Sequence, residues 1–211
     1  MDFHEIAQKM LGTFVAAGNK ERKTEFSRCE DQYVGVISDF SPEVDDFPVR
    51  LAADQRPEGQ ACLILILESP HVKEFSGVPG PAKGTTGDRI RKWLLEVRGF
   101  SLLRNYGLIL VNAVPYQCSL GFPTRYFGDE IFRAAWQQGG SDEFAERLNC
   151  IARNNDRIAN CCTLGSFKQH SLRREVQLVI DHMNMPNFLY RRTHPSSWHA
   201  SKNRRFEWPQ P

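Results

Sequence analysis

The run Cys62–Leu67 is apolar without interruption, and it constrains the fold more than any other stretch of the chain. Apolar runs of this length are typical of a strand that is covered on both faces, as in a parallel sheet flanked by helices. The run ends abruptly at Glu68, Ser69, Pro70 and His71. Ligands of open α/β sheets bind beyond the carboxyl ends of the strands, so these side chains are candidates for chemistry. A plain polar loop after a strand is the alternative interpretation.

A chain of 211 residues with 41% hydrophobic residues can bury a substantial core, most simply as one domain. We expect an α/β domain over residues 61–211, preceded by a helical and acidic elaboration over residues 1–60. No apolar run is long enough to span a bilayer and the first residues lack a signal-peptide pattern, so no membrane partner is expected. The six cysteines contain no CxxC pair. This usage is typical of a reduced intracellular protein, cytoplasmic or nucleoid-associated in a bacterium, without a metal or cofactor.

Charge is distributed unevenly along the chain. Residues 1–60 carry 7 basic and 12 acidic side chains, whereas residues 151–211 carry 10 basic and 4 acidic ones. A basic C-terminal third suits a polyanionic partner, because cations displace condensed counterions from a phosphate backbone. A solubilising surface is the alternative, and charge alone favours it.

The rest of the chain alternates between helical and strand patterns. Apolar residues at helical spacing predict helices over residues 2–17, 127–138, 142–155 and 166–180, and another after Gly87. Further apolar runs predict strands over residues 33–37, 106–112, 160–165 and 187–191. The acidic, proline-rich residues 41–59 are expected to form a surface connection. The alternation predicts a three-layer α/β/α sandwich around a mainly parallel sheet of about four strands.

A glycine-rich turn precedes the helix that follows the first buried strand, and it ends in Gly84, Thr85, Thr86 and Gly87. Free backbone N–H groups and the helix dipole favour a bound anion at such a turn, so we expect it to bind a phosphate. The residue order is neither a Walker A loop nor GxGxxG. A flexible linker is the alternative.

Two further strand ends carry polar groups. The strand over residues 106–112 ends on Asn112, whose amide can donate and accept at once, as reading a base edge requires. An asparagine that caps a turn is the common alternative. The last strand leads into residues 194–198, His-Pro-Ser-Ser-Trp, and then into a basic tail.

In this order, these motifs resemble those of the uracil-DNA glycosylase superfamily, over about residues 62–205. Residues 68–70, Glu-Ser-Pro, are similar to the Glu-Ala-Pro motif of its iron–sulfur branch, and the glycine loop with its helix is similar to the same branch. Residues 111–114 match the strand whose asparagine reads the base. Residues 164–165 match a Leu-Gly pair that opens a helix, and residues 194–197 match the final catalytic motif. The resemblance implies the fold of that superfamily.

The resemblance also implies a role for each candidate residue. A nucleotide would leave the stack and enter a pocket, where Asn112 would pair with its Watson–Crick edge. Glu68 would orient or deprotonate the attacking water, and His194 would stabilise the departing base as a hydrogen-bond donor. Trp198 would be a wedge that fills the gap left in the duplex. The DNA backbone would be held by the loop, the final motif and the tail: Gly84, Thr85, Thr86, Gly87, Ser196, Ser197, Lys202, Arg204 and Arg205.

Three alternatives accompany these roles. His194 could bond a backbone carbonyl, as many loop histidines do. Trp198 could be a core residue, and Arg204 and Arg205 could simply be solvated.

The chain departs from the superfamily pattern at several positions. Ser69 stands where several branches have Asp or Asn, and a serine alone is no base at neutral pH, so water activation falls on Glu68 or is weak. His71 stands where one branch has a tyrosine that excludes the thymine methyl. The aromatic residue that stacks on the base is absent near Ala82. Phe75 is the candidate substitute, and without one the pocket would be wider and admit a bulky modified pyrimidine. The cysteines do not follow the iron–sulfur spacing, so no cluster is expected.

The resemblance thus predicts a monofunctional DNA glycosylase that hydrolyses the N-glycosidic bond of uracil or a related modified base by base flipping. Single- or double-stranded DNA is the expected partner and a monomer the expected state. The main alternative is a module of the same fold that binds nucleic acid or nucleotides with weak or no catalysis. A hydrolase with Ser69 as nucleophile and His71 or His194 as base is a third, disfavoured by the lack of a Gly-x-Ser-x-Gly elbow.

Overall fold

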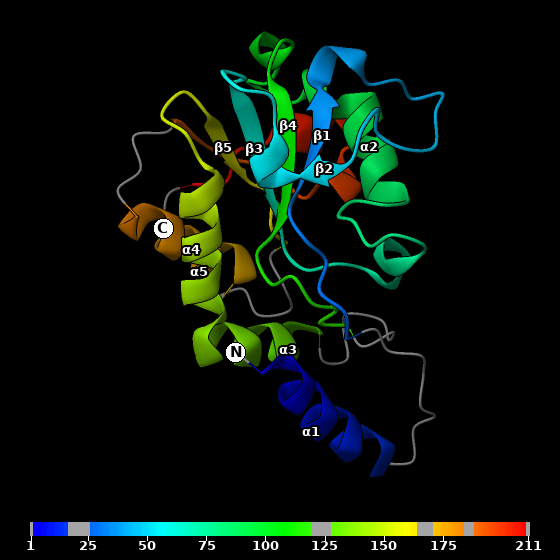
Figure 1. Cartoon of the computed structure of the whole chain (residues 1–211), viewed down its shortest axis with the longest axis vertical. Coiled ribbons are helices and arrows are strands. Elements are labelled where there is room, and N and C mark those ends of the chain that lie inside the picture. The colour runs from blue at the N-terminus through cyan, green and yellow to red at the C-terminus, as the bar shows by residue number, and fades with distance from the viewer. Residues whose placement is uncertain (1, 17–25, 120–127, 164–170, 184–187, 210–211) are drawn as a thin grey trace.

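A computed structural model describes residues 2–16, 26–119, 128–163, 171–183 and 188–209 of the chain (Figure 1). Its centre is a six-stranded sheet with the order β2-β1-β4-β3-β5-β6. The strands are β1 (Gln32–Val36), β2 (Leu51–Ala52), β3 (Cys62–Leu67), β4 (Gly107–Asn112), β5 (Arg157–Asn160) and β6 (Phe188–Arg191). The helices are α1 (Phe3–Ala16), α2 (Thr85–Trp93), α3 (Gly128–Ala135), α4 (Ser141–Ile151), α5 (Leu172–His182) and α6 (Ser201–Arg205).

The sheet is mixed. β4, β3, β5 and β6 are parallel to one another, whereas β1 runs antiparallel to β4 and β2 antiparallel to β1. The predicted α/β class is therefore confirmed. The prediction of about four strands is too low for the described residues, because the first 60 residues add β1 and β2 to the edge of β4. Part of the expected surface connection over residues 41–59 is thus β2.

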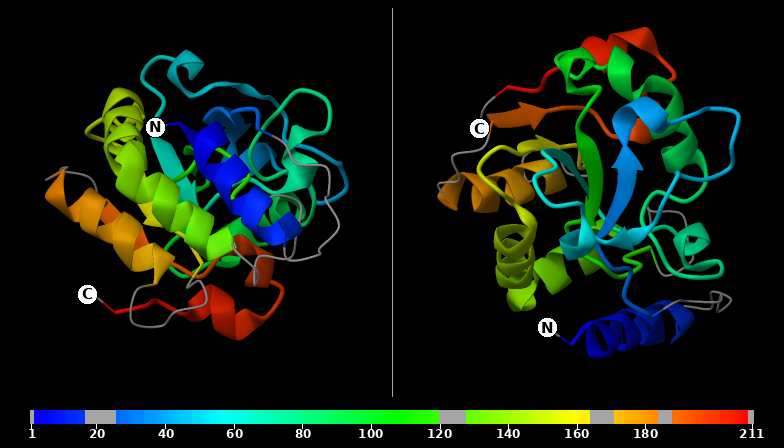
Figure 2. Two further views of the ribbon diagram at one scale, coloured as in Figure 1. Left: turned by 90° about the horizontal axis from the view of Figure 1, so that it is seen from below. Right: turned by 45° about the horizontal axis from the view of Figure 1, so that its top comes forward.

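Alternate side chains of β3 enter two separate cores, which explains its uniformly apolar sequence. Leu63 and Leu65 pack with the residues of α2, whereas Ile64 and Ile66 pack with those of α3, α4 and α5. Both faces of the sheet are therefore covered by helices. Figures 1 and 2 show α1 alongside α3 at one end of the molecule.

The order of the parallel strands creates a switch in the middle of the sheet. The chain passes from β3 to β4 through α2 on one face, and from β4 to β5 through α3 and α4 on the other. From β3 the chain continues to β4 on one side, and from β5 it continues to β6 on the other. The neighbouring strands β3 and β5 therefore send their connections in opposite directions. In open α/β sheets a crevice opens beyond the carboxyl ends of such strands. β5 begins three residues earlier than predicted, because Ile158 and Ala159 are its buried apolar residues.

Candidate functional site

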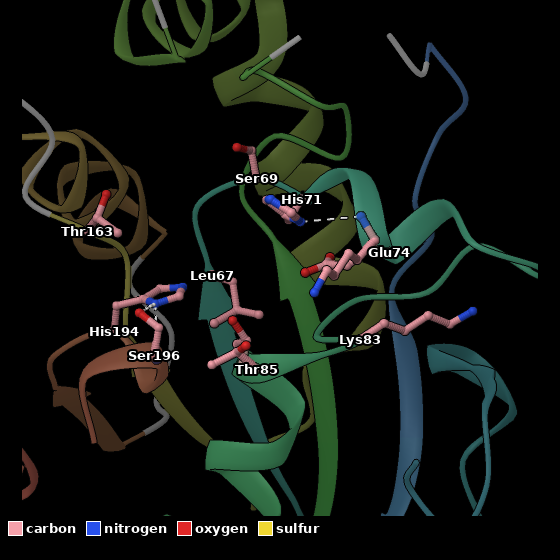
Figure 3. A pocket seen from close by; sticks show the side chains of 11 residues that line it. Leu67, Ser69, His71, Glu74, Lys83, Thr85, Thr163, His194 and Ser196 are labelled. Carbon is pink, nitrogen blue, oxygen red and sulfur yellow. Dashed lines mark hydrogen bonds between the residues drawn. The ribbon is translucent and has the colours of Figure 1, made fainter. Parts of the chain in front are cut away.

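A cavity of about 490 Å³ lies beyond the carboxyl end of β3 (Figure 3). This volume falls within the range of roughly 300–1,000 Å³ that is typical of small-molecule sites. Six of the predicted site residues line the cavity: Ser69, His71, Thr85, Thr86, His194 and Ser196. Five residues that the sequence did not single out complete the lining: Leu67, Lys73, Glu74, Lys83 and Thr163. Segments that are far apart in the sequence therefore meet at one site.

His194 faces the cavity from the loop that follows β6. Its Nδ1 accepts a hydrogen bond from the backbone N–H of Ser196 at 3.3 Å and lies 2.8 Å from the Ser196 hydroxyl. Burial, followed by the positive charge of Arg173, lowers the pKa of the imidazole to about 4. The ring is therefore neutral at pH 7 and carries its proton on Nε2, because Nδ1 is an acceptor. His194 thus offers one N–H donor at the cavity wall, and Ser197 supports it by donating from Oγ to the His194 carbonyl at 2.8 Å.

Glu68 lies behind the cavity wall and is not part of the lining. Its side chain is buried, and the hydroxyl of Thr163 donates a hydrogen bond to its Oε2. Burial, and then the negative charge of Asp129, raise the pKa of this carboxyl to about 8. Most of the Glu68 population is therefore protonated at pH 7, and Thr163 is the side chain that connects it to the cavity.

Asn112 lies at the end of β4, only 1% exposed and outside the cavity lining. Its Nδ2 lies 3.7 Å from the Sγ of Cys29, and its Oδ1 has no hydrogen-bond partner among the described residues. The Asn112 amide also lies near the carboxyl of Glu74 and acts to lower its pKa. Burial outweighs this effect and raises the pKa of Glu74 to about 8. Glu74 lines the cavity, so it links Asn112 to the site.

The glycine loop forms the wall that carries Thr85 and Thr86. Gly84 has a φ of +81°, and a Cβ on Gly87 would lie 2.0 Å from the carbonyl oxygen of Ala82, so both positions favour glycine. The two threonines stand in the first turn of α2, where free N–H groups favour an anion. The glycines themselves do not line the cavity and act through the shape of the loop.

Positive charge surrounds the same wall. Lys73 and Lys83 both line the cavity, and the ammonium of Lys83 donates to the carbonyl of Ser76 at 2.9 Å and to that of Val78. His71 is exposed at the rim, and its Nδ1 accepts from the backbone N–H of Lys73 at 3.3 Å. Two lysines and a helix N-terminus make this side of the cavity suitable for an anionic group.

Residues of the N-terminal region hold this loop in place. Gln32, on β1, donates from Nε2 to the carbonyl of Pro79 at 3.1 Å. Arg50 donates from Nη1 to Oε1 of Gln32 at 2.6 Å and to the carbonyl of Pro81 at 3.1 Å. The region predicted as an elaboration therefore supports the cavity wall.

Two aromatic side chains are not at the site. Phe75 is half-buried and does not line the cavity. The wedge role predicted for Trp198 requires an exposed indole, but Trp198 is 0% exposed. Its Nε1 donates to the carbonyl of Thr193 at 3.0 Å, and its ring packs against Phe100 with 6.4 Å between centroids. Trp198 is a core residue, which is the alternative that the sequence left open.

The basic tail is divided between structural and exposed groups. Arg204 lies over the ring of Trp93 at 4.2 Å, pairs with Glu96 at 3.1 Å and donates to the carbonyl of Trp198. It therefore fixes α6 to the residues after α2. Lys202 and Arg205 are exposed on α6 and remain accessible to a polyanion.

Glu74 is the buried ionisable group among the five lining residues that sequence reasoning missed. It comes six residues after Glu68 in a polar loop, and a glutamate in such a loop is usually solvated, so no local signal distinguishes it. The predicted Leu-Gly pair at residues 164–165 lies outside the described residues.

Within the described residues, no three His, Cys, Asp or Glu side chains gather in a way that could hold a metal ion. None of the described helices has the length and apolar character needed to cross a membrane. Comparisons of the chain with protein-family models, with curated proteins and with solved structures find no match.

Proposed function

We propose that this protein is a monofunctional DNA glycosylase that hydrolyses the N-glycosidic bond of uracil or a related modified base. The observation that carries the proposal is the convergence of three motifs, in the order typical of the uracil-DNA glycosylase superfamily, on one cavity. The proposal includes the three-layer fold of that superfamily, supported by the parallel strands β4-β3-β5-β6 and by helices on both faces of the sheet. It also includes DNA as the partner of an intracellular monomer.

The chemical step requires stabilisation of a base that departs as an anion. His194 offers a neutral N–H donor on Nε2 at the cavity wall, and this group would bond a base oxygen as negative charge develops there. A neutral imidazole is suited to this role, because its Nε2–H remains a donor at any pH above the low pKa of the ring.

The phosphates flanking the extruded nucleotide would bind at the opposite wall. Thr85, Thr86 and the first turn of α2 supply hydroxyl and backbone donors, and Lys73 supplies a positive charge. Exposed Lys202 and Arg205 would extend this contact along the backbone.

The attacking water would be activated by Glu68 through the Thr163 side of the cavity. The water oxygen would bond to the sugar carbon as the bond to the base breaks, and the water proton would pass through the Thr163 hydroxyl, which is bonded to Oε2 of Glu68, to the Glu68 carboxylate. This step needs ionised Glu68, whose pKa is about 8. We therefore expect kcat/KM to rise about tenfold per pH unit towards pH 8, and the pH–rate profile of Glu68→Gln to lack this rise.

The environment of Glu68 also favours a second candidate function, a module of the same fold that binds nucleic acid or nucleotides without turnover. Glu68 is buried, bonded to Thr163 and outside the lining, and Phe75 does not supply a stacking ring in the cavity. A protonated carboxyl cannot take a proton from water.

Base release from a uracil-containing oligonucleotide, detected by alkaline cleavage of the product strand, distinguishes the two candidates. A panel of modified bases is assayed beside uracil at pH 7 and pH 9, and DNA binding is measured in parallel. We expect release by the wild type, a loss of about 10²–10³-fold for His194→Ala, and retained DNA binding. His182→Ala, on the exposed end of α5, is the matched control and should release base like the wild type.

Folded protein that binds DNA but releases no base at either pH would establish the binding module instead. Folded protein that neither binds nor cleaves would refute both candidates.

A further inference from the structure

One wall of the cavity contains a carboxyl oxygen that the protein leaves unused. Glu74 is 4% exposed and lines the cavity, and its Oε2 has no hydrogen-bond partner among the described residues. Figure 3 shows the side chain pointing inward from the short 3-10 helix Val72–Phe75. Buried polar atoms are nearly always hydrogen-bonded, so an unused acceptor in a cavity wall indicates a partner that arrives with a ligand.

The position of this carboxyl is well defined. The backbone N–H of Glu74 donates to the carbonyl of His71 at 2.8 Å, and the N–H of Gly80 donates to the Glu74 carbonyl at 2.9 Å. Backbone groups of Ala82 and His71 and the amide of Asn112 lie close enough to the carboxyl to act on its pKa. These contacts fix the side chain while Oε2 stays unpaired.

A structural ion pair does not explain the burial of Glu74. Arg50 is the cation whose charge acts on it, but the guanidinium of Arg50 is bonded to Asp46, to Gln32 and to the carbonyl of Pro81. The neighbouring Asn112 also has an unused acceptor, Oδ1, among the described residues. A carboxyl keeps acceptor capacity even when it is protonated, as most of the Glu74 population is at pH 7. This part of the wall therefore suits a ligand that brings a hydrogen-bond donor.

We infer that Glu74 is a specificity-determining residue whose Oε2 accepts a hydrogen bond from a ring N–H of the bound base. The ligand class is a nucleobase with a lactam edge, an N–H beside a carbonyl, as in uracil or hypoxanthine. The inference rests on the proposed function, because it assumes that a base enters this cavity. The carbonyl of the same lactam edge would remain available to a donor such as His194.

The test measures binding of free bases, so it does not depend on turnover. Uracil and hypoxanthine are titrated against the wild type by NMR, beside 3-methyluracil and 1-methylhypoxanthine, in which a methyl group replaces the ring N–H. We expect the wild type to prefer each parent base by about tenfold, the contribution of one hydrogen bond to a buried carboxyl. Glu74→Met removes the acceptor at similar size and should lose this preference.

Glu74→Gln is the conservative variant and should keep the preference, because its side-chain oxygen can still accept. Glu58→Met, at an exposed glutamate outside the cavity, is the control and should behave like the wild type. Glu74→Ala provides a second truncation if Glu74→Met does not give a cooperative thermal transition.

Each outcome decides the inference. If the preference for the parent base persists unchanged in the truncated variants, it is steric and the inference about Glu74 is overturned. A wild type that binds parent and methylated bases equally overturns the inference as well. In either case, base release from the oligonucleotide would leave the proposed function intact. A wild type that binds no free base and releases no base from the oligonucleotide refutes both the inference and the proposed function.

Discussion

At the amino ends of β3 and β5 a buried carboxylate is surrounded by donors, whereas at the carboxyl ends of the same strands two buried carboxyls are not. Asp156, just before β5, accepts from Nη1 of Arg56 at 2.9 and 2.7 Å. It also accepts from the backbone N–H groups of Cys62 and Arg153, both at 2.8 Å. The second terminal nitrogen of Arg56, Nη2, donates to the carbonyl of Ile151 at 2.9 Å. This end of the sheet is a closed network.

The carboxyl ends are compensated less completely, with the Thr163 hydroxyl as a donor to Glu68. Burial raises the pKa values of Glu68 and Glu74 to about 8, and Oε2 of Glu74 has no partner among the described residues. Burial of an ionisable group is therefore not evidence of function by itself. The two ends differ in whether the protein itself supplies hydrogen bonds to the buried carboxyl oxygens or leaves one of them unpaired for a ligand.

Removal of the fully hydrogen-bonded carboxylate of Asp156 should have the largest effect on stability. Asp156→Ala leaves the buried guanidinium of Arg56 unpaired and should lower the free energy of unfolding by about 3–5 kcal/mol. Urea denaturation measures the change, with Asp54→Ala at an exposed aspartate as the control, expected within about 0.5 kcal/mol of the wild type. A loss below about 1 kcal/mol would contradict the view that this network is structural.

A glycine at the carboxyl end gives the next largest effect. In Gly87→Ala the new methyl group would lie 2.0 Å from the carbonyl oxygen of Ala82, so the loop must shift. We expect a loss of roughly 1–3 kcal/mol in thermal denaturation, together with weaker phosphate binding. Gly12→Ala in α1 is the matched control, since no atom lies within 4 Å of its Cβ. The Gly12→Ala variant should be stabilised by up to about 1 kcal/mol. Equal changes in stability for Gly12→Ala and Gly87→Ala would show that the loop has room for a methyl group at position 87.

The pH dependence of stability provides the smallest effect and the sharpest distinction between the two ends. The pKa of Glu68 is about 8 in the folded protein, against about 4.3 for an unfolded glutamate. Between these values the folded state holds a proton that the unfolded state has lost, so the stability of the wild type falls as pH rises. Glu68→Gln has no titrating carboxyl at this position, so its stability lacks this pH-dependent contribution.

We expect Glu68→Gln to gain roughly 1 kcal/mol relative to the wild type between pH 7 and pH 8.5. Chemical denaturation at both pH values measures the difference. A gap between the two proteins that does not change with pH would show that Glu68 ionises normally.

The parts of the fold that the sequence predicts well are those in which local pattern and burial agree. β3 and β4 are covered on both faces, so their sequences are apolar apart from the terminal Asn112 of β4, and their positions could be predicted to within a residue. His194, Ser69 and Thr85, which the resemblance places at one site, line the same cavity. Glu68 and Asn112 are placed there by the same resemblance but do not line it.

The remaining features depend on contacts between distant segments. Residues of β1 and the loop beyond it hold the glycine loop that follows Glu74, and no local pattern encodes these contacts. The two-residue strand β2 is exposed and owes its existence to pairing with β1. Trp198 lies four residues after His194, a spacing that suits a wedge, but the pocket beside Phe100 encloses it.

The pairing of β1 with β4 has a practical consequence for anyone who shortens this protein. A chain that starts at Ala61 would leave the backbone groups of β4 that face β1 unpaired, along an edge that is apolar up to Asn112. Open edges of this kind are templates for pairing with other molecules, so such a fragment is expected to aggregate. Biochemical work on the isolated C-terminal portion would then report on misassembled protein, and the first 60 residues belong in every expression plasmid.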